Sequence, residues 1–200
     1  MPLGREEIDA GEEFDGEVFA DFVWEEGDLR QREFRNCRFE RVRLPGALLA
    51  GVTLEDCVFQ RCDLTLAKIA GAAFRDVRFE HSKLMGVDWT DVRGLVFSVS
   101  FEECVLDLGT FSQRKMDGTS FRECQARETT FMGVDLSRAD FSGTDLSGAR
   151  FEDCILERAD LSKARNYVIR PEKNRLRETL FSYEAALEVV EGLGIRVPDR

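Results

Sequence analysis

Large apolar residues recur at every fifth position along most of this chain. The first run has no small or polar member and consists of Phe14, Phe19, Trp24, Leu29, Phe34, Phe39, Leu44, Leu49, Leu54, Phe59, Leu64, Ile69, Phe74, Phe79, Leu84 and Trp89. Neither an α-helix nor a β-strand, which alternates every two residues, produces this period. A strict short period instead indicates a repeat architecture, in which each unit buries its apolar face against its neighbours.

The same period resumes after a shift of two residues. The second run is Phe101, Leu106, Phe111, Met116, Phe121, Ala126, Phe131, Leu136, Phe141, Leu146, Phe151, Leu156 and Leu161. Two places before most large residues lies a smaller one, such as Val42 or Ala139, which marks a second inward position. Twelve residues separate Trp89 from Phe101 where ten would keep the phase, so we expect two extra residues to bulge outward.

A higher period of twenty residues is visible within the first run. Phe14, Phe34 and Phe74 fall on this period, with Leu54 between them. Four five-residue units would complete one coil, so residues twenty positions apart would stack on one another. We therefore predict a four-sided coil whose core includes Phe19, Phe39, Phe59, Phe79, Phe101, Phe121 and Phe141.

Each unit also has a characteristic order of residue types. A small residue, Asp, Leu or Phe, and then Ser follow one another most clearly in residues 139–143 (ADFSG) and 144–148 (TDLSG). This pattern resembles the pentapeptide-repeat family. The resemblance implies an all-β solenoid, a right-handed quadrilateral β-helix with a C-terminal helical cap. It divides the chain into an acidic lead-in (1–13), a repeat β-helix (14–165, with the phase slip at 90–100) and a capping and dimerisation tail (166–200).

The sequence contains no motif typical of catalysis or of a bound cofactor. Six cysteines occupy small inward positions without any CxxC pair, and we expect unbridged, metal-free core residues at Cys37, Cys57, Cys62, Cys104, Cys124 and Cys154. His81 is the single histidine, and no G-x-S-x-G, Walker A or G-x-G-x-x-G motif occurs. We therefore expect a protein that is not an enzyme and that has no cofactor.

The expected location is the cytoplasm. No apolar run approaches the ~18 residues of a membrane-spanning helix. Residues 1–20 are acidic, whereas a secretory signal begins with basic residues followed by an apolar core. We expect no association with a membrane.

The phase slip at residues 90–100 is the first departure from the repeat. Gly94 would permit an unusual backbone there, and the segment contains Asp91, Arg93 and Val96 as candidate partner-binding residues. A neutral insertion tolerated at a corner and a contact loop on a rigid scaffold are both compatible with this sequence.

The second departure is the tail after residue 165. Ser182 is suited to cap a helix that Gly192 or Gly194 would end. Such a helix would cover the open end of the solenoid, and its remaining apolar surface would pair with a second copy across a twofold axis. The predicted dimer interface consists of Phe181, Tyr183, Leu187, Val190, Leu193 and Ile195.

The tail also has a residue pattern of its own, comprising Asn166-Tyr167, Ile169, Pro171, Asn174, Leu176, Phe181-Ser182 and Gly194-Ile195. It resembles the C-terminal segment of the Qnr-like and albicidin-resistance branch of pentapeptide-repeat proteins. That resemblance implies a homodimer that binds DNA gyrase, and topoisomerase IV as a related target, and protects them from poisons through imitation of duplex DNA. The alternative is a structural or adaptor rod with another protein partner. The chain departs from Qnr in having no long projecting loop.

Charge is unevenly distributed along the chain. Residues 1–28 contain eleven acidic residues and one basic residue, whereas residues 29–130 have a net charge of +1. DNA mimicry along the whole rod is therefore not supported, and the acidic end supplies the other candidate partner-binding residues, Asp21, Glu25, Glu26 and Asp28. The overall charge of −11 disfavours direct binding of nucleic acid.

Overall fold

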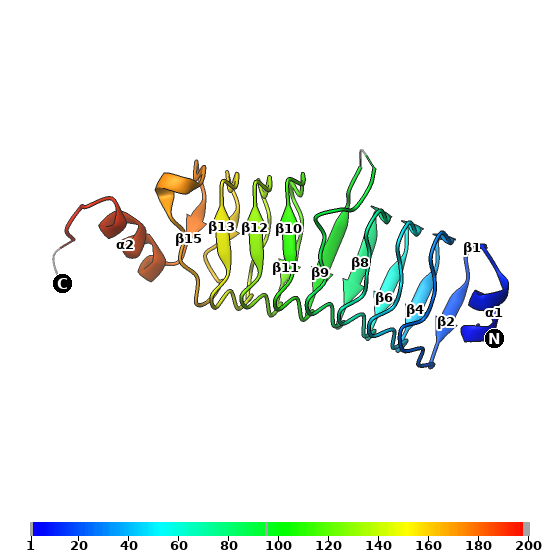
Figure 1. Ribbon diagram of the computed structural model, residues 1–200. Helices are drawn as coiled ribbons and strands as arrows, with labels where there is room; N and C mark the ends of the chain where they lie inside the picture. The colour runs from blue at the N-terminus through cyan, green and yellow to red at the C-terminus, as the bar shows by residue number, and fades with distance from the viewer. Residues whose placement is uncertain (1, 95, 198–200) are drawn as a thin grey trace.

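The computed structural model describes residues 2–94 and 96–197 and shows a rod of stacked coils with a helix at each end (Figure 1). The chain winds as a parallel β-solenoid of about eight turns, which confirms the predicted fold class. Residues twenty positions apart lie side by side on successive coils, as Phe19 and Phe39 do. We number the four sides by the large residues of the first coil: face 1 begins at Phe14, face 2 at Phe19, face 3 at Trp24 and face 4 at Leu29.

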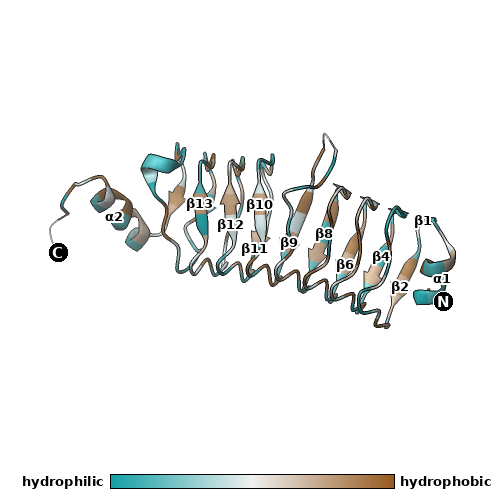
Figure 2. Cartoon of the chain, in the orientation of Figure 1, coloured by the Kyte–Doolittle hydropathy of each residue, from teal (hydrophilic) through white to brown (hydrophobic). Residues whose placement is uncertain are grey.

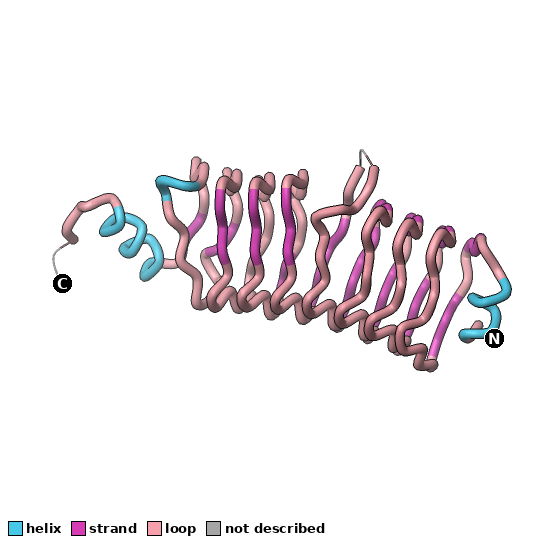
Figure 3. The backbone as a smooth tube through the Cα atoms, viewed as in Figure 1, coloured by secondary structure: helices cyan, strands magenta, loops and turns pink. Residues whose placement is uncertain are grey.

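Short parallel strands form on faces 1, 2 and 4 (Figure 3). Face 1 carries β1 (Glu13–Asp15), β3 (Glu33–Arg35), β5 (Thr53–Glu55) and β7 (Ala73–Arg75). Face 2 carries β2 (Val18–Ala20), β4 (Arg38–Glu40), β6 (Val58–Gln60), β8 (Val77–Glu80), β9 (Val99–Glu102), β11 (Phe121–Arg122), β14 (Asp160–Leu161) and β15 (Leu180–Phe181). Face 4 carries β10 (Thr110–Ser112), β12 (Thr130–Met132) and β13 (Arg150–Glu152). Isolated bridges such as Arg43 with Asp63 join the coils on face 3.

Aromatic rings fill the interior in columns that run along the rod. On face 2, the side chains of Phe19, Phe39, Phe59, Phe79, Phe101, Phe121 and Phe141 are all at most 2 % exposed. Consecutive rings are stacked, with centroids 4.4 Å apart for Phe39 and Phe59 and 5.1 Å apart for Phe59 and Phe79. Burial of a Phe side chain contributes about 1.5–3 kcal/mol, so this column is a major source of stability.

Most corners of the coil contain one outward residue with a positive φ. Between faces 1 and 2 this residue is Asn36 (φ 52°), Asp56 (53°) or Asp76 (52°) in successive coils. Asn and Asp tolerate the left-handed region better than other non-glycine residues. These corners let the chain change direction after a strand of only three residues.

The lead-in before the first strand forms a cap that the sequence did not reveal. The helix α1 (Arg5–Ala10) lies over the first coil and buries Ile8 completely. Arg32, at a small inward position of face 1, donates from Nε to the carbonyls of Ile8 (2.8 Å) and Gly11 (3.1 Å). The N-terminal end of the core is thereby covered.

At the other end, the coils continue beyond residue 165. Strands β14 and β15 pair Leu161 with Phe181, so one further coil forms without the repeat pattern. The 3₁₀ helix η1 (Pro171–Lys173) turns the chain within this coil. The helix α2 (Tyr183–Gly192) then leaves the rod, with Ser182 as its N-cap, as predicted. Figure 2 shows hydrophobic residues on α2, whereas α1 is largely hydrophilic.

Candidate partner-binding surface

The phase slip forms a loop that projects from the rod between β8 and β9 (Figure 1). At its two ends the regular ladder persists, because the backbone N–H of Arg93 donates to Ala72 and that of Ser98 donates to Phe74. These two bonds place Phe97 at the large inward position of face 1, and its ring contacts the Phe74 ring with centroids 6.2 Å apart. The loop therefore adds three residues between Arg93 and Phe97.

The expected bulge of two residues is thus wrong in detail. Three residues are added before Phe97, and one is missing after it. In other coils an outward corner residue such as Asp76 separates the last residue of face 1 from the first of face 2. Here Ser98 is followed directly by Val99, which pairs with Val77 on β8. The addition and the loss together give the shift of two residues.

The three candidate residues of the loop differ in their freedom to bind a partner. The Arg93 guanidinium donates to the carbonyl of Gly51 (3.0 Å) and to the hydroxyl of Thr53 (2.9 Å), so it holds the loop against an earlier coil. Val96 is 54 % exposed. Asp91 is exposed, and its carbonyl accepts a bond from Gly71. Asp91 and Val96 are therefore presented outward on an anchored base.

A second arginine holds the loop from the other side, and sequence reasoning missed it. Arg114 occupies a position that is usually small, and its Nη2 donates to the carbonyls of Thr90 (2.9 Å) and Val92 (2.5 Å). Its Nε is buried and has no hydrogen-bond partner among the described residues. An arginine in a column of small residues was the signal that would have identified it, as for Arg32.

The four acidic candidates near the N-terminus do not form one patch. Asp21 lies at the corner after face 2, Glu25 on face 3, Glu26 at the corner after face 3, and Asp28 on face 4. Asp21 accepts two bonds of 2.6 Å from Arg41, one coil further along. Among the described residues no ion pair involves Glu25 or Glu26, which are both exposed. Of these four carboxylates, only those of Glu25 and Glu26 are therefore free of a basic partner.

Arginine partners change the titration of the other two carboxylates. The side-chain hydrogen bonds from Arg41 lower the pKa of Asp21. The side-chain and backbone donors of Arg30 lower the pKa of Asp28 to about 2. Both carboxylates are consequently charged at neutral pH, but each forms an ion pair with a guanidinium.

The residues predicted for the dimer interface have two different environments. Phe181 belongs to β15 and packs against the core, with its ring near that of Tyr167 (centroids 6.2 Å apart). The Tyr167 hydroxyl donates to the carbonyl of Leu161 and accepts from the N–H of Ser182, which joins the last coil to α2. Of the other predicted residues, Tyr183 (58 %), Leu193 (58 %) and Ile195 (54 %) are exposed, and Leu187 and Val190 are half-buried.

The cysteines act as hydrogen-bond donors inside the coil. The Cys62 thiol donates to the carbonyls of Phe39 (3.3 Å) and Gln60 (3.5 Å), and Ser82 makes the equivalent bonds one coil further along. Burial raises the pKa of Cys62 to about 12, so its thiol stays protonated. All six cysteines are free, and no three described His, Cys, Asp or Glu side chains gather as metal ligands. His81 lies 3.1 Å from Glu103 at the surface.

Comparison with known families agrees with the period of the sequence. A model of the pentapeptide repeat region matches residues 32–111, and a model of eight pentapeptide repeats matches residues 110–143 and 135–165. The chain belongs to the pentapeptide-repeat family. No curated protein sequence is significantly similar to this pentapeptide-repeat protein.

Solved structures resemble this pentapeptide-repeat protein in fold. One trypsin-treated variant of QnrB1, a plasmid-mediated fluoroquinolone resistance protein, matches with a TM-score of 0.56 at 18 % identity over 93 % of this chain and 90 % of its own. A second trypsin-treated variant of QnrB1 gives a TM-score of 0.51 at 19 % identity over 94 % and 92 % of the two chains. HetL, involved in heterocyst differentiation regulation in the cyanobacterium Nostoc sp. strain PCC 7120, matches at 0.48 and 14 % identity over 89 % and 90 %.

Neither described helix has the ~20 residues that a transmembrane helix needs, since α1 has six residues and α2 has ten. The described pentapeptide-repeat coils bury their large apolar side chains inside the rod. The accessible features of the rod are therefore the projecting loop, the two unlike ends and the charged outer columns.

Proposed function

We propose that this pentapeptide-repeat protein is a non-catalytic binding protein that engages a type II topoisomerase, DNA gyrase or topoisomerase IV, and protects it from a poisoning antibiotic. The observation that carries the proposal is the likeness to QnrB1, which extends over 93 % of this chain. The residue pattern of the tail, which resembles the Qnr-like branch, supports the same assignment. The packed interior favours binding on the outer surface over chemistry in a pocket.

Charge pairing restricts DNA mimicry to part of the rod. Duplex DNA carries one negative charge per ~1.7 Å of its axis. Along the rod, however, acidic side chains pair with basic ones about one coil away, as Glu55 does with Arg75 (2.7 Å) and Glu178 with Arg158 (2.7 Å). Glu25 and Glu26 have no such pairs among the described residues. Because residues 1–28 contain eleven acidic residues and one basic residue, we assign phosphate imitation to the N-terminal end alone.

The unlike ends of the rod favour a homodimer joined through the tail. The N-terminal end is closed by α1 over the buried Ile8. The C-terminal end presents Tyr183, Leu193 and Ile195 to solvent. An isologous contact between two such tails would cover this surface and leave both acidic ends pointing outward. Sedimentation of a variant truncated after Ser182 tests this arrangement, because a stable dimer without α2 would contradict it.

A cleavage assay tests the protection itself. Purified gyrase and topoisomerase IV are incubated with supercoiled DNA and a cleavage-stabilising drug, with increasing amounts of the protein. We expect less drug-induced linear DNA, with no change in DNA when the topoisomerase is absent. Undiminished cleavage across several topoisomerases and poisons would contradict the proposal.

The acidic end supplies a matched pair of variants. Replacing Glu25 and Glu26 by Gln removes unpaired charge, whereas replacing Glu184 and Glu188 by Gln removes charge from α2. If phosphate imitation matters, the first pair weakens topoisomerase binding more than the second, and the difference shrinks as salt rises. Equal effects would contradict charge localisation at the N-terminal end.

A second candidate function is an adaptor rod that binds a different protein. It is favoured by exposed apolar side chains at the corner between faces 3 and 4, where Leu66 is 62 %, Met85 37 % and Leu108 55 % exposed. These residues lie on successive coils and away from the acidic end. Replacing Leu66 and Leu108 by Ser without loss of drug protection would separate this surface from the topoisomerase function.

A further inference from the structure

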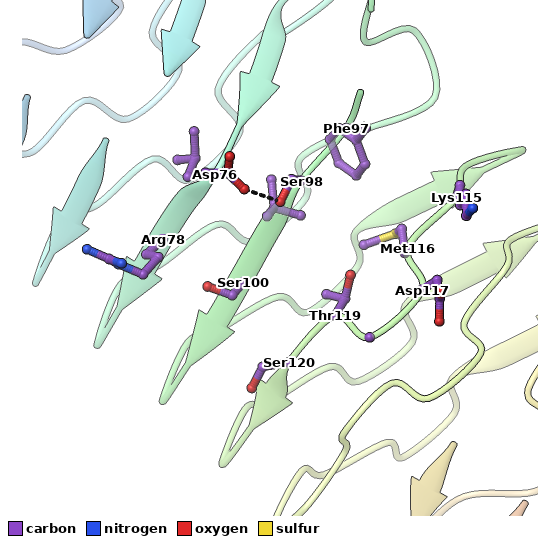
Figure 4. A pocket seen from close by; sticks show the side chains of 13 residues that line it. Asp76, Arg78, Phe97, Ser98, Ser100, Lys115, Met116, Asp117, Thr119 and Ser120 are labelled. Atoms are coloured by element: carbon purple, nitrogen blue, oxygen red, sulfur yellow. Dashed lines mark hydrogen bonds between the residues drawn. The ribbon is translucent and has the colours of Figure 1, made fainter. Parts of the chain in front are cut away.

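The outside of the rod is hollowed where the corner residue between Ser98 and Val99 is missing. The coils before and after it turn between faces 1 and 2 through Asp76 (φ 52°) and Gly118 (φ 72°), but this coil passes directly from Ser98 to Val99. The hollow has a volume of about 320 Å³ and is lined by three successive coils, at residues 76–78, 97–100 and 115–120 (Figure 4). At about 30 Å³ per water, this is room for roughly ten water molecules.

The hollow also interrupts the backbone ladder between two coils. In regular coils the corner N–H donates to the next coil, as Asp56 does to Arg75 (2.9 Å) and Gly118 to Ser137 (2.7 Å). No corner residue exists here to reach the carbonyl of Asp117, which has no hydrogen bond among the described residues. The chain therefore presents an acceptor that its own fold leaves to solvent.

A donor is left free beside this acceptor. On the next two coils the N–H of Asp140 donates to Thr119 (3.0 Å) and that of Asp160 donates to Ala139 (2.9 Å). The equivalent bond from Ser120 to Val99 is absent from the described hydrogen bonds. The Ser120 N–H and the Asp117 carbonyl, three residues apart on the same coil, are therefore both open to pairing with the main chain of a bound segment.

The charges around the hollow are balanced. Asp76 accepts a bond from Ser98 (2.8 Å, Figure 4), and Asp117 pairs with Arg138. Arg78 and Lys115 have no ion pair among the described residues. A phosphate would meet two carboxylates as well as two cations here. A neutral polar segment instead finds amide, carbonyl and hydroxyl groups and no net charge.

We propose that this hollow is a docking site for one loop of a protein partner, whose main chain pairs with these two unpaired groups. A carbonyl of that loop accepts from the Ser120 N–H, and an N–H donates to the Asp117 carbonyl. The loop residue is polar and uncharged, because the rim offers Ser100 and Ser120 between opposite charges. Identification of the partner as a type II topoisomerase rests on the proposed function. The assignment of the hollow as a docking site does not depend on it.

Two substitutions block the hollow with little risk to the fold. Ser100 and Ser120 occupy the same position of face 2 as Arg38 and Arg78, so arginine is already accommodated in that column. Ser100→Arg and Ser120→Arg place a long side chain in or across the hollow.

A third substitution is the matched control. Ser162→Arg makes the same exchange on face 2, two coils beyond Ser120, where the ladder is complete. Its position follows the large residue Leu161, as that of Arg122 follows Phe121, so arginine is accommodated in this column as well. Circular dichroism checks that all three variants fold.

The first measurement needs no identified partner. Acetyl-serine N-methylamide, which has the two amides of a single residue, is titrated into ¹⁵N-labelled protein up to high millimolar concentration. We expect saturating shifts at the amides of Ser100, Gly118 and Ser120, and their loss in Ser120→Arg but not in Ser162→Arg. Shifts that do not saturate, or that are equal at the intact corner of Asn36, would overturn the proposed site.

The second measurement uses the topoisomerase. If wild-type protein binds gyrase, we expect Ser100→Arg and Ser120→Arg to weaken binding at least tenfold and Ser162→Arg to leave it within twofold. Unchanged binding in the first two variants would overturn the hollow as the docking site while the proposed function stands. Absence of wild-type binding alongside a positive peptide titration would overturn the proposed function and support the hollow.

Discussion

The coils before and after the projecting loop use the same repeat but place their aromatic rings differently. Before the loop, aromatic columns lie on the adjacent faces 1 and 2, so that Phe14 meets Phe19 edge to face at 5.4 Å. After it, they lie on the opposite faces 2 and 4, and Phe111 meets Phe121 across the core at 6.0 Å. The strands change face together with the aromatic columns, since β1, β3, β5 and β7 lie on face 1 whereas β10, β12 and β13 lie on face 4.

The loop stands where the second aromatic column changes face. Phe97 follows Phe74 and ends the column on face 1, and Trp89 starts the one on face 4. The Phe97 ring lies 6.2 Å from that of Phe74 and 6.0 Å from that of Trp89. Trp89 then stacks on Phe111 at 5.5 Å. Three large rings, those of Phe74, Trp89 and Phe97, thus meet beside the slip, at the level where the packing pattern changes.

The largest expected effect is in the column that both regions share. Phe59→Ala and Phe121→Ala each remove a buried ring of face 2, and each should lower the free energy of unfolding by ~3–5 kcal/mol through lost burial and a cavity. Chemical denaturation measures both. If the two regions form one cooperative rod, the losses agree within about 1 kcal/mol. A near-zero loss for Phe59→Ala would contradict the four-sided register.

A smaller effect is expected at the junction. Arg114→Met keeps an apolar stem but removes two charge-assisted bonds to the carbonyls of Thr90 and Val92. Bonds from a charged group contribute about 1.5–3 kcal/mol, so we expect a loss in that range and faster amide exchange at Gly94 and Phe97. Arg122→Met, on exposed face 2, is the control. Unchanged exchange at the loop would mean that Arg93 alone anchors it.

Much of the fold was predictable because one period determines two things at once. A five-residue repeat assigns each large residue to the inside, and a twenty-residue repeat stacks it on a neighbour. The same spacing would have shown the charge pairing, because Asp21 and Arg41 are twenty residues apart, as are Glu55 and Arg75. Once the coil length is known, acids and bases can be matched from the sequence alone.

Features outside the period could not be predicted in the same way. The added loop residues and the lost corner residue give only a net shift of two, so spacing alone cannot separate them. The cap by α1 depends on Arg32 reaching two carbonyls, and the last coil is held by the Tyr167 hydroxyl. Each of these depends on one specific polar contact instead of a repeated pattern. The proposed contact residues likewise remain predictions, to be tested with a partner.

A further test compares cysteines of the two regions. Cys62 and Cys154 each donate to two carbonyls, and the Cys154 bonds to Phe131 and Glu152 are both 3.4 Å long. Replacement by Val, which already occupies the column of Cys62 at Val42 and that of Cys154 at Val134, should cost ~1 kcal/mol at either site through loss of the donor. Replacement by Ser should cost less, since Ser82 already makes these bonds. Thermal unfolding would show a decrease of about 2–4 °C for each Val variant.

The smallest expected effect concerns surface carboxylates, one from each region. Hydrogen bonds from Arg30 lower the pKa of Asp28 to about 2, and those from Arg138 lower the pKa of Asp117. Because an unfolded Asp titrates near ~3.9, each pair adds its stabilisation above that pH and loses it as the pH falls through the lowered pKa. Both pairs are exposed to solvent, so their effect on stability is small and direct titration is the sensitive measurement.

Carbon-detected NMR of the side-chain carboxyl groups follows both pKa values in one experiment. Arg30→Met should raise the pKa of Asp28 toward ~3.9 and leave that of Asp117 unchanged, and Arg138→Met should do the reverse. This independence is expected because the two pairs lie on different coils and more than one Debye length apart along the rod. A pKa shift at both carboxylates from either variant would mean that the two regions respond as one electrostatic unit. That outcome would contradict the view that each carboxylate is affected mainly by its own arginine partner.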